Sequence, residues 1–168
     1  SVIVVDEDGM LRPVSAPSLP DHYSARLDGL PIGPLVGSCG AAAYLCEAVT
    51  STDIGSDPRW ADYKHYVLPL GLKACWSSPI SDATGRVVGT FAFYYREVRE
   101  PGQVERMIVS TCVHLCALAI ERHQRVSERE RKEAEGKEYK RPVKQVWAIV
   151  TVQGILDNDF YIGTLRQS

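Results

Sequence analysis

The sequence lacks the features that mark several classes of protein. It has no CxxC pair and no strong excess of one charge, because 19 Lys and Arg face 21 Asp and Glu, a net charge of −2. This balance gives no electrostatic reason to expect nucleic acid or an anionic membrane as a partner. No apolar run approaches the roughly 20 residues that a bilayer-spanning helix needs, so we expect no membrane segment. The 168 residues, 45% of them hydrophobic, suit one globular domain with an appendage.

The cysteines form no pattern of a disulfide framework or a metal site. Cys112, His114 and Cys116 come closest, but alternate residues of a helix point in different directions and cannot converge on one metal. An odd number of cysteines without a framework is typical of a reducing compartment, which predicts a cytoplasmic protein. The set is Cys39, Cys46, Cys75, Cys112 and Cys116.

Motifs of enzymes are also missing. The chain has no nucleophile elbow, no phosphate-binding loop and no carboxylates paired at a spacing for acid–base chemistry. We therefore expect no catalytic residues. The sequence opens at Ser1 directly into an apolar run without methionine, so we also expect a fragment of a longer polypeptide.

Hydrophobic periodicity predicts short strands and helices in alternation. Two hairpin-like pairs of strands and a run of short helices give the order β-β-α-α-β-α-β-β-α. This order predicts an α+β fold with a central antiparallel sheet flanked by helices. The predicted strands cover 2–5, 11–16, 49–52, 72–80 and 87–95, and the predicted helices cover 21–27, 41–47, 59–68 and 101 onward.

The last predicted helix carries apolar positions that step by 4, 3, 4 and 3. Two interpretations follow: the stripe forms the seam of a parallel dimer, or it covers the domain's own sheet. We expect a domain over 1–125 and a charged helical linker over 126–140, whereas 141–168 stays unassigned and can begin a next domain. The stripe consists of Val104, Ile108, Thr111, Leu115 and Leu118.

Three groups of residues, in order, resemble the signature of GAF domains, a PAS-like family. The resemblance covers roughly residues 1–125. It implies a ligand pocket between the sheet and the helices and a long C-terminal signalling helix. It also implies a sensory unit of the kind that precedes diguanylate cyclase, phosphodiesterase or histidine kinase domains in bacteria, which suggests cyclic-di-GMP signalling. The groups are the glycine-rich 30–42, then 53–54 with 57–60, and 74–80 with 85–95.

Six residues are candidates for ligand binding. Ser38 and Cys39 lie in a Gly-Ser-Cys-Gly turn before a helix, where backbone N–H groups can hold an anion or lower a thiol pKa; alternatively Cys39 packs as a small apolar residue. Asp53 can meet a ligand or fix a turn. For the aromatic residues, pocket lining and plain core packing are equally open. They are Trp60, Tyr63 and Trp76.

The resemblance implies one enzymatic alternative. Free methionine-(R)-sulfoxide reductases are GAF domains with a similar Gly-x-Cys-Gly turn, which would make Cys39 the nucleophile. These enzymes also use a cysteine in the upstream loop and one after the Asp-Ile-type motif. Here both segments lack cysteine, and Cys75 lies within a predicted strand. An oxidised Cys39 would then have no resolving partner.

Three cofactor hypotheses find no support. Bilin-binding GAF domains carry a cysteine on the helix that corresponds to 58–68, which here offers only His65, so the sequence argues against a covalent bilin. The Asn-Lys-x-Phe-Asp-Glu motif of cGMP-binding relatives is missing. Haem would need a ligand among scattered histidines without a supporting cluster. We predict a sensory domain that binds an unidentified small molecule, forms a homodimer through its long helix and controls an output domain in the same polypeptide.

Overall fold

The computed structural model describes the backbone of residues 1–136 and the side chains of residues 1–131. A five-stranded sheet in the order β2-β1-β5-β4-β3 forms its centre. All four neighbouring pairs run antiparallel, as predicted. The strands are β1 (Val2–Val5), β2 (Leu11–Ser15), β3 (Val49–Ser51), β4 (Ala74–Ser81) and β5 (Val87–Tyr95).

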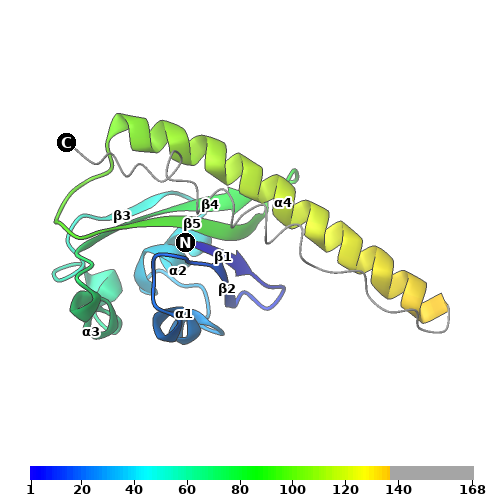
Figure 1. The fold of residues 1–168 in the computed structure, drawn as a ribbon, viewed down its shortest axis with the longest axis horizontal. Helices are drawn as coiled ribbons and strands as arrows, with labels where there is room; N and C mark the ends of the chain where they lie inside the picture. The colour runs from blue at the N-terminus through cyan, green and yellow to red at the C-terminus, as the bar shows by residue number, and fades with distance from the viewer. Residues whose placement is uncertain (137–168) are drawn as a thin grey trace.

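The helices divide between the two faces of the sheet (Figure 1). The long helix α4 lies across one face and extends past its edge, whereas α1, α2 and α3 lie on the other side. This arrangement confirms the predicted α+β class and element order. The helices are α1 (Asp21–Leu27), α2 (Gly37–Leu45), α3 (Lys64–Val67) and α4 (Gln103–Gly136), with 3₁₀ turns η1 (Pro58–Trp60) and η2 (Leu68–Leu70).

Strand alternation gives the sheet a separate hydrophobic core on each face. Neighbouring residues of a strand point to opposite faces, so Cys75 and Trp76 belong to different cores. Trp76 packs with Ile80 and the buried residues of α4, whereas Cys75 packs with Ile3 and residues of the α1–α3 side. Strands β1, β4 and β5 therefore contribute neighbouring side chains to both cores.

Helix α2 begins four residues earlier than the sequence analysis predicts. The Gly-Ser-Cys-Gly segment forms its first turn rather than a preceding loop. Gly37 has a φ of +54° at this point, and a Cβ there would lie 3.4 Å from the indole ring of Trp60. Glycine is favoured here because of the left-handed backbone, whereas the indole lies at ordinary contact distance.

The predicted single helix over 59–68 is wrong. The segment is divided into η1, α3 and η2, because its turns close through 3₁₀-type bonds such as Tyr63 N–H to the Trp60 carbonyl. Asp57 caps the first turn by accepting from the Arg59 N–H at 2.9 Å. The three side chains predicted to share a face still do, since Trp60, Tyr63 and Val67 pack in one core.

Helix α4 uses one face for the sheet and leaves the predicted stripe largely uncovered. Val109, Cys112 and Cys116 are buried against the sheet. Of the stripe, Ile108 is half-buried and the other members are exposed, with Val104 at 64% and Leu118 at 50%. The interpretation that the stripe covers the domain's own sheet therefore applies only to Ile108, because other residues of α4 cover the sheet.

One helix does reach the length and composition of a membrane span, contrary to the expectation from the sequence. Gln103–Arg131 contains an 18-residue window of mean hydropathy 1.3, of which 22% is buried. The sequence analysis misses it because the apolar side chains are spread over both faces of α4 rather than grouped in one run. Part of that apolar content covers the sheet through Val109, Cys112 and Cys116.

Strands β1 and β5 approach each other most closely at Gly89. A Cβ added to Gly89 would lie 2.5 Å from the carbonyl oxygen of Ile3 and 3.3 Å from the Cα of Val4. Backbone atoms cannot move aside as a flexible side chain can. The junction of the central strands therefore depends on the absence of a side chain at this position.

We predict that Gly89→Ala lowers the free energy of unfolding by about 1–3 kcal/mol, because the new methyl group forces β1 away from β5. Urea denaturation followed by circular dichroism measures this change. Val98→Ala, at a side chain that is 57% exposed, is the control and should change stability by less than about 0.5 kcal/mol. Equal stabilities for the two variants would contradict the steric argument.

Candidate functional site

Three polar side chains from separate elements form a buried network at the start of α2. The Trp60 Nε1–H donates to the Ser51 hydroxyl at 2.9 Å and to the Ser38 hydroxyl at 3.2 Å. The two hydroxyls are 2.8 Å apart and hydrogen-bond to each other. All three residues are at most 2% exposed. The network joins η1, β3 and the first turn of α2 in one fixed arrangement.

A small cavity of about 20 Å³ lies beside this network. Its volume is close to what one water molecule occupies, since a site needs about 10–15 Å³ to hold a water. Its described lining includes no Asp, Glu, Lys, Arg or His, and most of the lining side chains are aromatic or aliphatic. The lining residues are Leu11, Tyr23, Leu27, Leu30, Val36, Gly37, Ser38, Cys39, Trp60, Tyr63 and Tyr94.

Two tyrosine hydroxyls provide polar groups of the cavity wall. The Tyr23 and Tyr94 oxygens are 3.2 Å apart, and the two rings meet edge to face with centroids 6.1 Å apart. Burial raises the pKa of both phenols above the ordinary range, so both stay neutral. The wall therefore offers uncharged hydroxyl groups within an apolar enclosure, which suits a small neutral molecule.

The Cys39 thiol lies at the cavity and has a partner that the sequence analysis excludes. The thiols of Cys39 and Cys75 lie close enough to interact, and Ser77 and Tyr94 also lie near Cys39. Donation from Cys75, then from Ser77, lowers the pKa of Cys39, whereas burial raises the pKa of Cys75. The expectation that Cys39 has no cysteine partner is wrong, because Cys75 faces α2 from within its strand.

The structure brings four of the six predicted site residues to the cavity: Ser38, Cys39, Trp60 and Tyr63. Whether they bind a ligand stays a prediction. Asp53 does not line the cavity. Its carboxylate accepts from the Gly55 N–H at 2.9 Å and the Ser56 hydroxyl at 2.8 Å, which closes a turn.

Trp76 also lies away from the cavity, on the opposite face of the sheet. It stacks near Phe93, with ring centroids 6.4 Å apart, and the guanidinium of Arg106 lies 5.5 Å from its ring. The placement follows from alternation, since Trp76 is the immediate neighbour of Cys75. Its assignment to the pocket is corrected to the core beneath α4.

Other residues of this site were missed, although a signal for them exists. Cys75 and Tyr94 are register partners on β4 and β5, and Ser77 follows Cys75 on the same face. Counting alternate positions on the two predicted strands places these three side chains together. What the count lacks is the identity of the face that carries α2, and only the tertiary structure supplies it.

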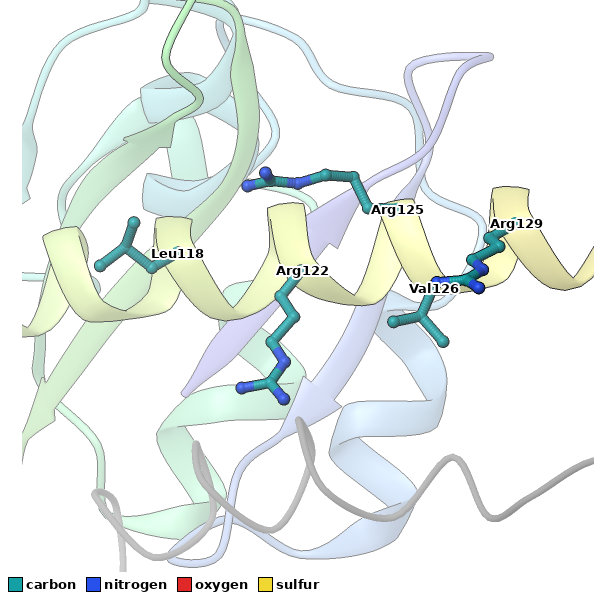
Figure 2. A pocket seen from close by; sticks show the side chains of 5 residues that line it. All are labelled: Leu118, Arg122, Arg125, Val126 and Arg129. Carbon is teal, nitrogen blue, oxygen red and sulfur yellow. The ribbon is translucent and has the colours of Figure 1, made fainter.

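A larger hollow of about 470 Å³ lies along α4, and Figure 2 shows the side chains beside it. All of its described lining residues come from this one helix, and none comes from the sheet. Such a surface can bind another chain but does not enclose a small molecule. Its lining residues are Leu118, Arg122, Arg125, Val126 and Arg129. Within residues 1–131, no three His, Cys, Asp or Glu residues gather to hold a metal ion.

Comparison with known families decides which fold this is. The family model described as GAF domain matches residues 1–121. The chain belongs to the GAF domain family. A curated relative, the methyl sulfide methyltransferase-associated sensor of Methanosarcina acetivorans, is 34% identical over 110 residues, which span 66% of this chain and 11% of that protein. The GAF domain described above therefore corresponds to a small part of a much longer sensor.

One solved structure supports the fold. A domain assigned to a two-component sensor histidine kinase of Sinorhizobium meliloti 1021 matches with a TM-score of 0.62 at 22% identity, over 77% of this chain and 82% of that one. The reduced form of fRMsr of Staphylococcus aureus matches with a TM-score of 0.47 at 15% identity, over 67% of this chain and 64% of that one. The first match supports the fold, and the second is too distant to bear on function.

We predict that Trp60→Phe destabilises this GAF domain by about 1–3 kcal/mol more than Trp76→Phe, because only Trp60 uses its N–H in hydrogen bonds. Trp76 is the matched control, since its buried Nε1 has no partner among the described residues. Both substitutions remove a similar volume. Chemical denaturation of the two variants measures the difference, and equal losses would show that the network adds no stability.

Proposed function

We propose that this GAF domain is the sensory part of a signalling protein and binds a small molecule in the cavity between the sheet and α1–α3. The observation that carries the proposal is the small cavity itself, in which aromatic and hydroxyl side chains converge from α1, α2, η1 and β5. The curated relative is named a sensor, which agrees with this role. We propose a binding module rather than an enzyme.

The cavity volume limits how binding can occur. About 20 Å³ accommodates no molecule much larger than water, so a larger ligand must displace part of the wall. The wall includes the loop between α1 and α2, which contributes Leu30 and Val36. Rearrangement of this loop would enlarge the cavity without breaking the Ser38–Ser51–Trp60 network. The binding energy would then favour an opened conformation of the domain.

The two central strands offer a path from the cavity to α4. Tyr94 lines the cavity, whereas its neighbour Phe93 packs into the core beneath α4. At one end of α4, Glu105 binds Arg99, with atoms 3.0 Å apart. Farther along α4, Glu121 accepts from the Ala83 N–H of the β4–β5 hairpin at 2.8 Å. A shift of these strands would therefore move α4 as a body, which is how we propose the domain signals to an output domain in the same polypeptide.

We also propose that α4 pairs with its copy in a parallel homodimer. Because other residues cover the sheet, the stripe of Val104, Thr111, Leu115 and Leu118 remains exposed for this purpose. Its 4-3 spacing is that of a two-stranded coiled coil. A cytoplasmic location is part of the same proposal, because five cysteines without a disulfide framework in the sequence are typical of a reducing compartment.

We predict that a thermal-shift screen with nucleotides, inorganic anions, haem and amino-acid derivatives finds a compound that raises Tm in a saturable way. In Tyr63→Ala the affinity for that compound should fall by about tenfold or more, because the cavity loses an aromatic wall. Tyr44→Ala is the matched control, since Tyr44 is 54% exposed on α2 and outside the cavity. Equal affinities in both variants would place the binding site elsewhere.

The screen also tests the enzymatic alternative, for which the adjacent Cys75 now supplies a partner thiol. Free methionine sulfoxide is therefore included with a dithiol reductant. Binding without consumption supports the sensory role. Reduction of the sulfoxide that disappears in Cys39→Ser would show that the domain is a reductase instead.

For the dimer, we predict that sedimentation at tens of micromolar shows two copies of the chain, and that Leu118→Glu converts them to monomers. The charge would enter the apolar seam, where it cannot be solvated. Val98→Glu, at an exposed residue outside α4, should leave the dimer intact. A monomeric wild-type chain, or dissociation by both substitutions, would contradict the proposed seam.

A further inference from the structure

Two cysteines from distant parts of the sequence, Cys39 of the cavity wall and Cys75 of β4, lie in one core cluster. Cys75 is the register partner of Ser51 on β3, and the Ser51 hydroxyl bonds to Ser38, which immediately precedes Cys39. The network that fixes the start of α2 therefore also fixes Cys39 against Cys75. Both cysteines belong to one core cluster, at 5% and 0% exposure, and their thiols lie close enough to interact.

The surroundings of the pair favour a thiolate on Cys39. It lies in the first turn of the nine-residue helix α2, where unpaired backbone N–H groups and the helix dipole stabilise negative charge. Ser77 is fully buried within reach of Cys39, and its hydroxyl forms no other hydrogen bond in the described structure. An unused buried hydroxyl next to a thiol is a donor available for a developing anion.

A second pair of buried cysteines shows how different this environment is. Cys112 and Cys116 lie one turn apart on α4 and face the apolar core beneath it. Burial alone raises the pKa of Cys112. Burial is also the main reason that the pKa of Cys116 is raised to about 12. These two thiols are packing residues and provide an internal reference for Cys39 and Cys75.

The cavity gives Cys39 access to a very small reagent. Cys39 lines it directly, and its volume of about 20 Å³ admits a molecule of the size of water. Hydrogen peroxide is only slightly larger, whereas bulky alkylating agents and disulfides do not fit. The small volume of the cavity therefore favours a peroxide as the oxidant that reaches Cys39.

We propose that Cys39 and Cys75 are a peroxide-reactive thiol pair that closes into an intramolecular disulfide. The Cys39 thiolate attacks one peroxide oxygen, the O–O bond breaks, and the leaving hydroxide takes a proton to become water. Cys39 is then a sulfenic acid. The Cys75 sulfur attacks the Cys39 sulfur, and the hydroxyl group leaves with the Cys75 proton as a second water molecule. The two thiols lose two electrons and two protons, and the peroxide gains them.

The disulfide would connect the first turn of α2 to β4 and is reversed by a dithiol through two exchange steps. The chemistry goes beyond the proposed ligand binding and does not depend on it. It needs only Cys39 in the cavity wall, with Cys75 and Ser77 of β4 near it. The disulfide would affect signalling through β4, because Trp76 on the same strand packs beneath α4.

The test treats the reduced 168-residue chain with a small excess of hydrogen peroxide, then blocks remaining thiols and maps peptides without reduction. We expect two peptides joined by a disulfide between Cys39 and Cys75, which dithiothreitol separates. Cys112 and Cys116 should remain reduced and therefore become alkylated when the protein is unfolded. Cys46 is exposed, so the experiment is repeated in Cys46→Ser to exclude exchange between molecules.

Two variants separate the steps. In Cys75→Ser, Cys39 should accumulate as a sulfenic acid that dimedone labels, and in Cys39→Ser the oxidation of Cys75 should slow at least about tenfold. Cys112→Ser is the matched control and should oxidise as the wild type does. The circular dichroism of each variant verifies folding, and the wild-type peptide map does not depend on any variant.

Absence of the linked peptide in the wild type, or equal oxidation of the pair on α4, would overturn the proposal. Ligand binding in the cavity would be unaffected by that result, because the thermal-shift screen is performed on reduced protein. Conversely, a disulfide in a chain that binds no compound of the screen would support the thiol pair and count against the proposed ligand site.

Discussion

The buried hydrogen bonds among Ser38, Ser51 and Trp60 are the constraint on which this GAF domain depends. They connect the first turn of α2 to strand β3 and to the turn η1. The indole lies against Gly37, whose left-handed backbone favours glycine. Removing one partner leaves buried polar groups unsatisfied, so the arrangement is held as a unit.

From this point the sheet divides the molecule into two chemically different halves. On the α1–α3 side, tyrosine hydroxyls, serines and thiols gather around a small cavity. On the α4 side, the core is apolar and its two cysteines serve as packing residues. Adjacent residues of β4 and β5 belong to different halves, so β5, which contributes Tyr94 to the cavity wall, also supports the long helix through Phe93.

Much of this could be predicted from the sequence, because period-two and period-3.6 patterns depend on local geometry alone. Strand β5 was predicted with its observed bounds, and the element order was correct. The segment over 59–68 was not, since proline, the Asp57 cap and contacts of Trp60 with distant serines favour 3₁₀ turns over a regular helix. The early start of α2 was also missed, because it requires Gly37 in a left-handed conformation beside an indole.

The sequence by itself determined the family, the antiparallel sheet and the membership of Ser38, Cys39, Trp60 and Tyr63 in one region. Only the tertiary structure decided which strand face carries that region, which moved Trp76 to the opposite core and brought Cys75 to Cys39. The reason is physical. Alternation places neighbouring side chains of a strand on opposite faces of the sheet. The packing of α2 on one face and α4 on the other decides which core each side chain joins.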